Sequence, residues 1–177
     1  MYYGGAVRRF RDRLSSYERP WHNQFLQLMT DIDKFKDAVG QGVTTTRGIR
    51  MSDTTTRGIR VQVRSEFIPD RSSPRDGSYL FQYHVRISNV GAEMTQLVAR
   101  EWIITSADGE VERVKGQGVV GEQPVLPPGG SFEYTSYCPL KAAVGSMQGS
   151  YQMVTTGGER FDAVIAPFTL AVPNALN

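Results

Sequence analysis

The clearest structural signal in the chain is the segment Tyr79-Leu80-Phe81-Gln82-Tyr83-His84-Val85-Arg86-Ile87-Ser88. Its odd-numbered positions are aromatic or aliphatic and most of its even-numbered positions are polar, which is the period of a strand with one buried and one solvated face. Residues 59–67 alternate in the same way, with Ile59, Val61 and Val63 between polar side chains. Both segments therefore predict strands of an antiparallel sheet.

Further short strands follow at regular spacing toward the C-terminus. We expect them at 95–105, 110–115, 118–120, 131–138, 147–155 and 161–172. Asp108-Gly109 is a hairpin signal, and the proline and glycine residues of 127–130 separate two of the later strands. Seven or eight short strands with no helix between them predict a mainly β domain at 59–177, built as an antiparallel β-sandwich.

The N-terminal region follows a helical period instead. Between residues 7 and 39, apolar side chains recur three or four positions apart, on one face of a helix that Pro20 interrupts. We predict an amphipathic α-helical segment over residues 1–42, formed by one kinked helix or by a helical hairpin. Its apolar stripe needs a surface to cover, so self-association through residues 7–39 is one expectation.

A direct repeat separates these two regions. The heptapeptide Thr-Thr-Thr-Arg-Gly-Ile-Arg occurs at 44–50 and again at 54–60, and a single repetition is too little for a solenoid. We interpret residues 43–58 as a linker that carries a local duplication or the junction of a fusion. Charge also changes here, since residues 1–50 hold nine Lys and Arg against five Asp and Glu, and residues 51–177 hold 11 against 13.

Composition narrows the classes of function. Cys138 is the only cysteine of the 177 residues, so neither an intramolecular disulfide nor a cysteine-rich zinc site is available. The longest uncharged run, 163–177, is too short and too rich in proline to span a bilayer, so we expect no membrane segment and a cytoplasmic protein. A near-neutral domain binds the phosphate backbone poorly, so we do not expect a nucleic-acid partner.

Residues 116–121, Gly-Gln-Gly-Val-Val-Gly, match the GxGxxG pattern of dinucleotide-binding turns. Three prolines among the next seven residues exclude the phosphate-binding helix that this pattern requires. The simplest interpretation is a glycine-kinked strand or bulge. The alternative is a loop whose N–H groups bind an anion with help from two nearby cations. The residues of that candidate ligand-binding site are Arg113, Lys115, Gly116, Gly118 and Gly121.

Catalytic groups are few. The chain has two histidines, His22 and His84, and sequence spacing alone does not exclude a pair between one of them and Cys138. A buried, inert thiol is the preferred interpretation. Four glutamates of the β region, at positions 110, 112, 122 and 133, lack the spacing of a metal-binding loop. We therefore expect no catalytic residue, no metal and no cofactor.

Several ordered blocks of the β region resemble the ApaG domain. The blocks are Trp102 to Thr105, Val114 to Pro124, Pro128 to Ser136, Cys138 to Leu140 and Gly145 to Met153, with Arg57-Gly58-Ile59 and Ser72-Ser73-Pro74 before them. The resemblance covers about residues 51–173. It implies a fibronectin type III or immunoglobulin-like sandwich and an association with cobalt and magnesium homeostasis in bacteria.

Two functions are compatible with these sequence features. Similar domains in eukaryotic F-box proteins look like protein-interaction modules, so the first expectation is a non-catalytic module that binds an unidentified protein. The second is a small-ligand sensor that binds pyrophosphate, a nucleotide or a metal–nucleotide at the glycine-rich stretch 116–121.

Overall fold

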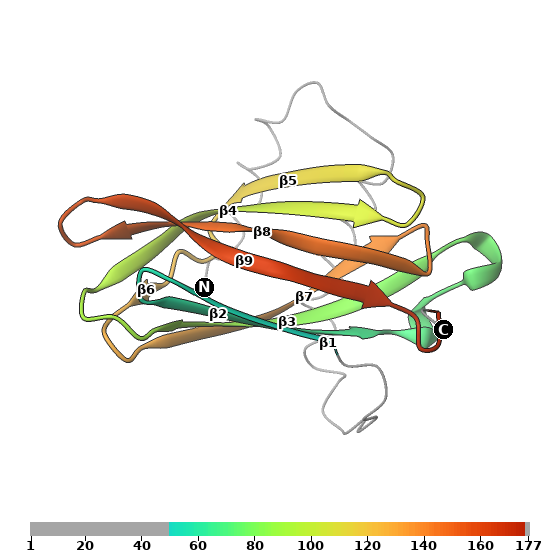
Figure 1. Ribbon diagram of the computed structural model, residues 1–177, viewed down its shortest axis with the longest axis horizontal. Helices are drawn as coiled ribbons and strands as arrows, with labels where there is room; N and C mark the ends of the chain where they lie inside the picture. The colour runs from blue at the N-terminus through green and yellow to red at the C-terminus, as the bar shows by residue number, and fades with distance from the viewer. Residues whose placement is uncertain (1–49, 176–177) are drawn as a thin grey trace, which may run out of the picture. The chain divides into compact units, whose positions relative to one another are not determined.

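The alternating segments form two antiparallel sheets that face each other (Figure 1). The computed structural model describes residues 50–175, and its first sheet has the strand order β1-β2-β3-β7. The bounds of these strands are Arg50–Thr56 for β1, Ile59–Phe67 for β2, Tyr79–Asn89 for β3 and Ser131–Leu140 for β7. Each neighbouring pair is antiparallel.

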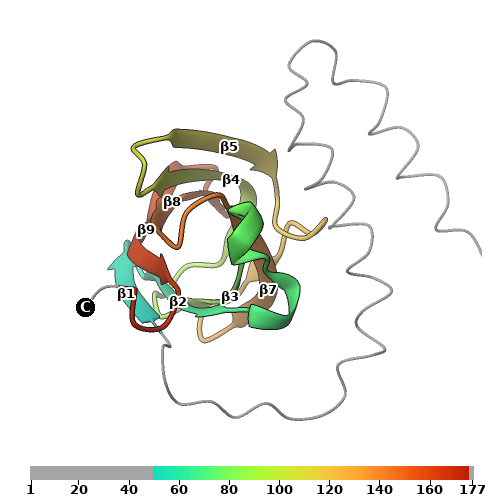
Figure 2. The same cartoon turned by 90° about the vertical axis from the view of Figure 1, so that its right-hand side faces the viewer.

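The second sheet has the order β5-β4-β8-β9, and the two-residue strand β6 pairs with the start of β4. Its strands are β4 (Thr95–Ser106), β5 (Val111–Gln117), β6 (Val125–Leu126), β8 (Val144–Thr155) and β9 (Arg160–Ala171). Viewed end-on, the two sheets lie face to face, and β1 runs beside β9 (Figure 2). The predicted antiparallel β-sandwich is confirmed.

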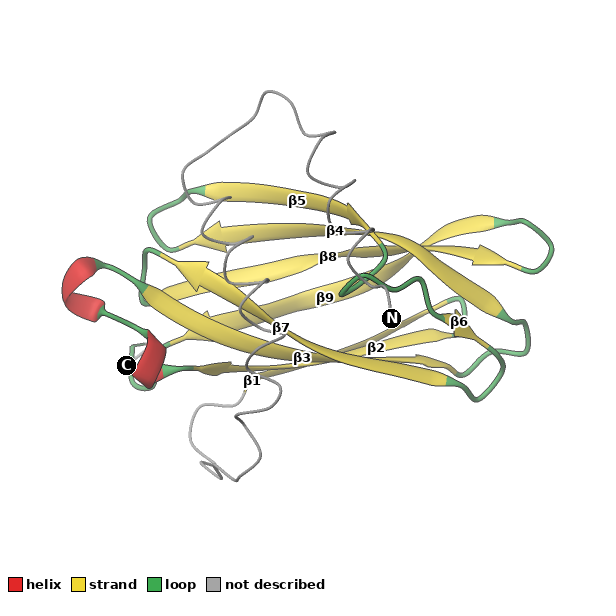
Figure 3. Cartoon of the chain, turned by 180° about the vertical axis from the view of Figure 1, so that it is seen from behind, coloured by secondary structure: helices red, strands yellow, loops and turns green. Residues whose placement is uncertain are grey.

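Helical structure within residues 50–175 is limited to two short turns (red in Figure 3). These 3₁₀ turns, Pro69–Arg71 and Pro74–Asp76, connect β2 to β3. No helix in this part of the chain has the length and apolarity that crossing a membrane requires. The predicted helical segment 1–42, and the self-association expected through residues 7–39, lie outside the described residues.

Part of the stretch interpreted as a linker is instead a strand. β1 occupies Arg50–Thr56 and pairs with β2 over its whole length, so the interpretation of 43–58 as a linker is wrong for these residues. Its inward positions are Ser and Thr, and these polar side chains give none of the apolar alternation by which the other strands are recognised. The sandwich therefore begins before residue 59.

The second copy of the repeated heptapeptide encodes the hairpin between β1 and β2. Arg57 and Gly58 form its turn with positive φ angles of 49° and 81°, as a type I′ hairpin turn requires. The Arg57 guanidinium donates two hydrogen bonds to the Glu159 carboxylate, at 2.7 and 2.6 Å, and lies over the ring of Phe161. The hairpin is thus attached to β9 and to the turn that precedes it.

Aromatic side chains fill the space between the sheets. The ring centroid of Trp102 on β4 lies 5.5 Å from that of Tyr83 on the facing sheet. Within its own sheet, the Trp102 ring also contacts Tyr151 and Phe168, at 6.2 and 5.9 Å between centroids. All four side chains are buried. Burial of side chains of this size supplies most of the stabilisation that holds two sheets together.

Gly149 makes room for this arrangement. It lies opposite Trp102 in the ladder between β4 and β8. A Cβ atom at this position would lie 2.0 Å from the carbonyl oxygen of Glu101, which belongs to the backbone of the neighbouring strand. Since backbone atoms of a central strand cannot move aside cheaply, a side chain is excluded here.

We predict that Gly149→Ala lowers the free energy of unfolding by about 1–3 kcal/mol or more, because the added methyl group forces β4 and β8 apart. Urea denaturation followed by circular dichroism measures the change. The matched control is Gly157→Ala in the turn between β8 and β9, where the nearest atom would lie at an ordinary 3.6 Å and the expected change is within about 0.5 kcal/mol. Equal losses in the two variants would contradict the steric argument.

Candidate functional site

The glycine-rich stretch 116–121 ends β5 and enters a tight turn. Val119 and Glu122 exchange two backbone hydrogen bonds, at 2.8 and 2.9 Å, around Val120 and Gly121, whose φ angles are 44° and 83°. At Gly118, which has a φ of 56°, a Cβ atom would lie 2.1 Å from the carbonyl oxygen of Glu122. The strand predicted at 118–120 is therefore wrong, and a turn with left-handed residues takes its place.

Gly116 accommodates an arginine that no sequence motif marks. It lies opposite Arg100 on β4, and a Cβ atom on it would approach the guanidinium group to 3.0–3.2 Å. Arg100 Nη1 donates to the carbonyl oxygens of Gln117 and Gly118, at 3.2 and 2.7 Å. The guanidinium thus anchors the end of β5 and the first residue of the turn. The groups that the turn directs at this cation are carbonyls.

The two cations predicted for an anion site lie elsewhere. Arg113 Nη1 is 3.3 Å from one carboxylate oxygen of Glu101, and Lys115 Nζ is 3.5 Å from the other. Both alternate with Gly116 along β5, so they project from the opposite face of the strand. The structure brings Arg113 and Lys115 together around Glu101 and does not bring them to the glycines.

Most N–H groups of the turn are already used. Gly118 N donates to Val98 O at 2.9 Å, and the amides of Val119 and Glu122 bond each other's carbonyl groups. Within the described chain, the N–H groups of Val120 and Gly121 donate to no backbone acceptor. Two exposed amides at the tip of the turn are therefore what remains available for an anion.

Buried phenol groups lie on the inner side of Arg100. Burial raises the pKa of Tyr83 to about 12, while its hydrogen bond with Ser136 acts in the opposite direction. The hydroxyl groups of Tyr134 and Tyr151 lie 2.5 Å apart, and burial raises both of their pKa values as well. The charge of Arg100 lowers the pKa of each of the three tyrosines, but by less than burial raises it. These phenols stay neutral at physiological pH and serve packing and hydrogen bonding.

Cys138 and His84 do not form a pair. Cys138 is buried on the inner face of β7, opposite Phe81, whereas His84 lies on the outer face of β3, opposite Thr135. Burial raises the pKa of the Cys138 thiol, and the charge of Glu112 adds to the rise. The structure confirms that Cys138 is buried, and a protonated thiol is a weak nucleophile.

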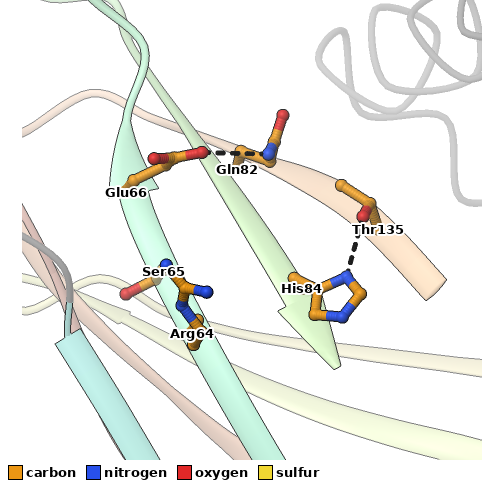
Figure 4. Close-up of a pocket in the computed structure, with 6 residues that line it drawn as sticks. All are labelled: Arg64, Ser65, Glu66, Gln82, His84 and Thr135. Carbon is orange, nitrogen blue, oxygen red and sulfur yellow. Dashed lines mark hydrogen bonds between the residues drawn. The ribbon is translucent and has the colours of Figure 1, made fainter. Parts of the chain in front are cut away.

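A shallow hollow of about 170 Å³ lies on the outer face of the β1-β2-β3-β7 sheet (Figure 4). It is lined by Arg64, Ser65, Glu66, Gln82, His84 and Thr135. His84 Nδ1 is 3.1 Å from Thr135 Oγ1, and its Nε2 is 3.2 Å from the Glu133 carboxylate. Gln82 Nε2 donates to Glu66 at 3.0 Å. The hollow combines donors and acceptors already held in position by their neighbours.

Arg64 differs from the other arginines of this face. Arg60 is paired with Asp53, and Arg86 Nε lies 3.3 Å from Glu133. Arg64 has no hydrogen-bond or ion-pair partner within residues 50–175, and its guanidinium is exposed at the rim of the hollow. It is therefore a cation on this face that is available to an external acceptor.

The candidate metal ligands are dispersed. Glu110 and Glu112 belong to the β4–β5 hairpin, Glu122 to the turn after β5, and Glu133 to β7. In the part of the chain that the structure describes, no three His, Cys, Asp or Glu side chains gather where they could hold a metal ion.

Comparisons with known proteins identify related chains. A family model described as the ApaG domain matches residues 69–155. Protein ApaG of Anaeromyxobacter sp. (strain K) is 58% identical over 127 residues, which cover 72% of this chain and 100% of the relative. Protein ApaG of Dechloromonas aromatica is 50% identical over the same shares. The crystal structure of an ApaA protein from Bordetella pertussis is similar with a TM-score of 0.64 and 43% identity, over 70% of this chain and 97% of that one.

The neutral phenols predict a loss of stability at alkaline pH. Because the folded pKa of Tyr83 exceeds its ordinary value of 10.0, the folded protein keeps a proton that the unfolded chain releases. The contribution of the neutral Tyr83 phenol to the free energy of unfolding is complete below about pH 10. It is lost between about pH 10 and 12, by up to about 1.4 kcal/mol per pH unit. We expect Tyr83→Phe to reduce this slope in urea denaturation series, and Phe81→Leu, which removes no titrating group, to leave it unchanged. Identical slopes for Tyr83→Phe and the parent chain would contradict the assignment.

Proposed function

The chain belongs to the ApaG domain family, and from this premise we propose that it is a non-catalytic binding module whose ligand is another protein. The observation that carries the proposal is the unpaired guanidinium of Arg64 at the rim of a polar hollow on an exposed sheet face. Arginine is enriched among the residues that dominate protein–protein binding energies, because its planar group donates several hydrogen bonds in a fixed geometry.

The neighbours of Arg64 support this role. Arg60 and Arg86 are neutralised by carboxylates of the same sheet, so their charges are held in place and contribute little new attraction. Gln82, Thr135 and His84 surround the hollow with polar atoms that a partner can bond. An acidic side chain of the partner, seated beside Arg64, is the complement that this arrangement favours.

We also propose a sandwich type, a location and a cellular role for this protein. Three strands, β2-β3-β7, facing four strands, β5-β4-β8-β9, support a fibronectin type III-like sandwich to which β1 is added. We propose that the protein acts in the cytoplasm, and that its link to cobalt and magnesium homeostasis, which the family resemblance implies, runs through the partner protein.

The partner-binding role is tested by charge reversal. We expect Arg64→Glu to weaken binding of a captured and purified partner at least about tenfold, because a central arginine is replaced by a repelling carboxylate. Titration calorimetry measures the affinity. The matched control is Arg160→Glu on β9 of the other sheet, an exposed arginine that also has no partner among residues 50–175. Equal affinities for Arg64→Glu and the parent chain, or equal losses of affinity in the two variants, would show that the hollow is not part of the binding interface.

A sensor of small anions is the second candidate. It is favoured by the two N–H groups of Val120 and Gly121 that have no backbone acceptor in the described chain. Against it, Arg113 and Lys115 are engaged with Glu101 on the opposite face of β5. The carbonyl oxygens of Gln117 and Gly118 face the nearest other cation, Arg100.

We predict that pyrophosphate, ATP and diadenosine tetraphosphate, each with and without Mg²⁺ or Co²⁺, cause no saturable shift of the Val120 and Gly121 amide resonances at millimolar concentration. The cation beside the turn, Arg100, is bonded to the carbonyl groups of Gln117 and Gly118, and two isolated amides without a free cation bind phosphate weakly. An amide NMR titration of the full chain measures this, with Gly158 in the turn between β8 and β9 as the internal reference. Saturable shifts confined to residues 116–121 would establish the sensor instead.

A further inference from the structure

The outermost strands of the two described sheets are β1 and β7 in one and β5 and β9 in the other, where the two-residue strand β6 also lies on the β5 side of β4. Edge strands expose unpaired N–H and C=O groups, which folded proteins cover or protect with charge. β1 and β9 run side by side, and Val164 N on β9 donates to the Thr56 hydroxyl of β1 at 3.1 Å. These two edges cover each other. The edges that remain are β5, which pairs only with β4, and β7, which pairs only with β3 among the described strands.

The hydrogen-bond register shows which groups of β7 point away from the sheet. Asn89 N donates to Gly130 O at 2.9 Å, and bonded pairs alternate along an antiparallel ladder. The even-numbered residues of β7 therefore bond to β3. The odd-numbered residues direct both N–H and C=O to the free edge, and they are Ser131, Glu133, Thr135 and Tyr137, followed by Pro139, which has no N–H.

The same reasoning shows that β5 is protected. Gly118 N donates to Val98 O and Ser106 N to Glu110 O, both at 2.9 Å, so the even-numbered residues of β5 bond to β4. Its free edge carries the odd-numbered residues, which include Arg113 and Lys115. Arg113 and Lys115 share the single Glu101 carboxylate, so this edge keeps a net positive charge. Two copies of β5 placed edge to edge would bring these like charges together, which destabilises a strand pair.

β7 lacks this protection. Its free-edge residues include no lysine or arginine, and the one charged residue is Glu133, a single carboxylate that Arg86 and His84 on β3 contact. Pro139 limits pairing at one end only. The edge is also complementary to itself, because antiparallel pairing centred on Thr135 places Thr135 opposite its own copy and Glu133 opposite Tyr137 of the second copy. Thr–Thr pairs are favourable across strands.

Charge also selects this register over its neighbour. Pairing centred on Tyr134 would place Glu133 opposite Thr135 of the second copy, with the two Glu133 carboxylates diagonal to each other. Centring on Thr135 moves the two carboxylates about 13 Å apart along the strands. We propose that β7 pairs with β7 of a second copy of this chain, antiparallel about a two-fold axis at Thr135, so that the two four-stranded sheets become one continuous sheet.

A disulfide cross-link tests the register in the full chain. Hydrogen-bonded antiparallel partners have Cα atoms about 5.5 Å apart, which suits a disulfide, so we expect oxidised Thr135→Cys to run as a covalent dimer on a non-reducing gel. Lys115→Cys on the β5 edge and Glu133→Cys, about 13 Å from its own copy, are the controls and should stay monomeric under the same treatment. The native Cys138 is buried and common to all three. Cross-linking of Glu133→Cys as readily as Thr135→Cys overturns the register.

Sedimentation velocity tests the association itself. We expect the full chain to be dimeric at micromolar concentration and Thr135→Lys to be monomeric and folded, because the substitution places two ammonium groups at the two-fold axis. Gln62→Lys, on the same face but two strands from the edge, should remain dimeric. Arg64→Glu should also remain dimeric, and this result distinguishes self-association through β7 from the binding of another protein at the hollow. A monomeric parent chain overturns the proposal. A dimeric, folded Thr135→Lys variant overturns it as well.

Discussion

The Trp102 indole packs across the gap between the two sheets and joins their inner faces. Its contacts with Tyr83 on one sheet and with Tyr151 and Phe168 on the other fix which face of each strand is buried. Because side chains alternate strictly along a strand, a buried inner face determines the outer one, and a slip of one residue would exchange the two. The exposure of His84 and Arg64 follows from the burial of Tyr83 and Val63.

The strands with clean alternation could be predicted from the sequence. β2 and β3 coincide with the alternating segments, since their period of two reflects one buried face. The sequence does not predict β1, because its inward residues, Ser52, Thr54 and Thr56, are polar although half-buried. The strand therefore shows no alternation of apolar and polar side chains. The turn after β5 has the residue types of a strand, because Val120 is β-branched and its residue type does not predict a positive φ.

Arg100 shows why the site was harder to predict than the fold. A bulge between Leu97 and Ala99 shifts the alternation of β4, so that odd-numbered residues face inward before it and even-numbered residues after it. Strict alternation from Leu97 would therefore have placed Arg100 on the outer face, although the structure directs it inward beside Tyr151. The glycine pattern at 116–121 was visible in the sequence, but the reason for Gly116 is the space that the Arg100 guanidinium occupies. Such a tertiary cause cannot be read from a local motif.

The odd-numbered residues of β7 form both its outer face and its free edge. In this strand the residues whose side chains are exposed are also those whose N–H and C=O groups point away from β3. Thr135 therefore lines the hollow that Arg64 borders and also lies at the midpoint of the unprotected edge. Pairing of two β7 strands about Thr135 would bring the two hollows to either side of the axis on one continuous face, since antiparallel neighbours in a sheet share their faces. A partner protein would then meet two Arg64 guanidinium groups on a single surface, and simultaneous contact with both would strengthen binding without any new kind of contact.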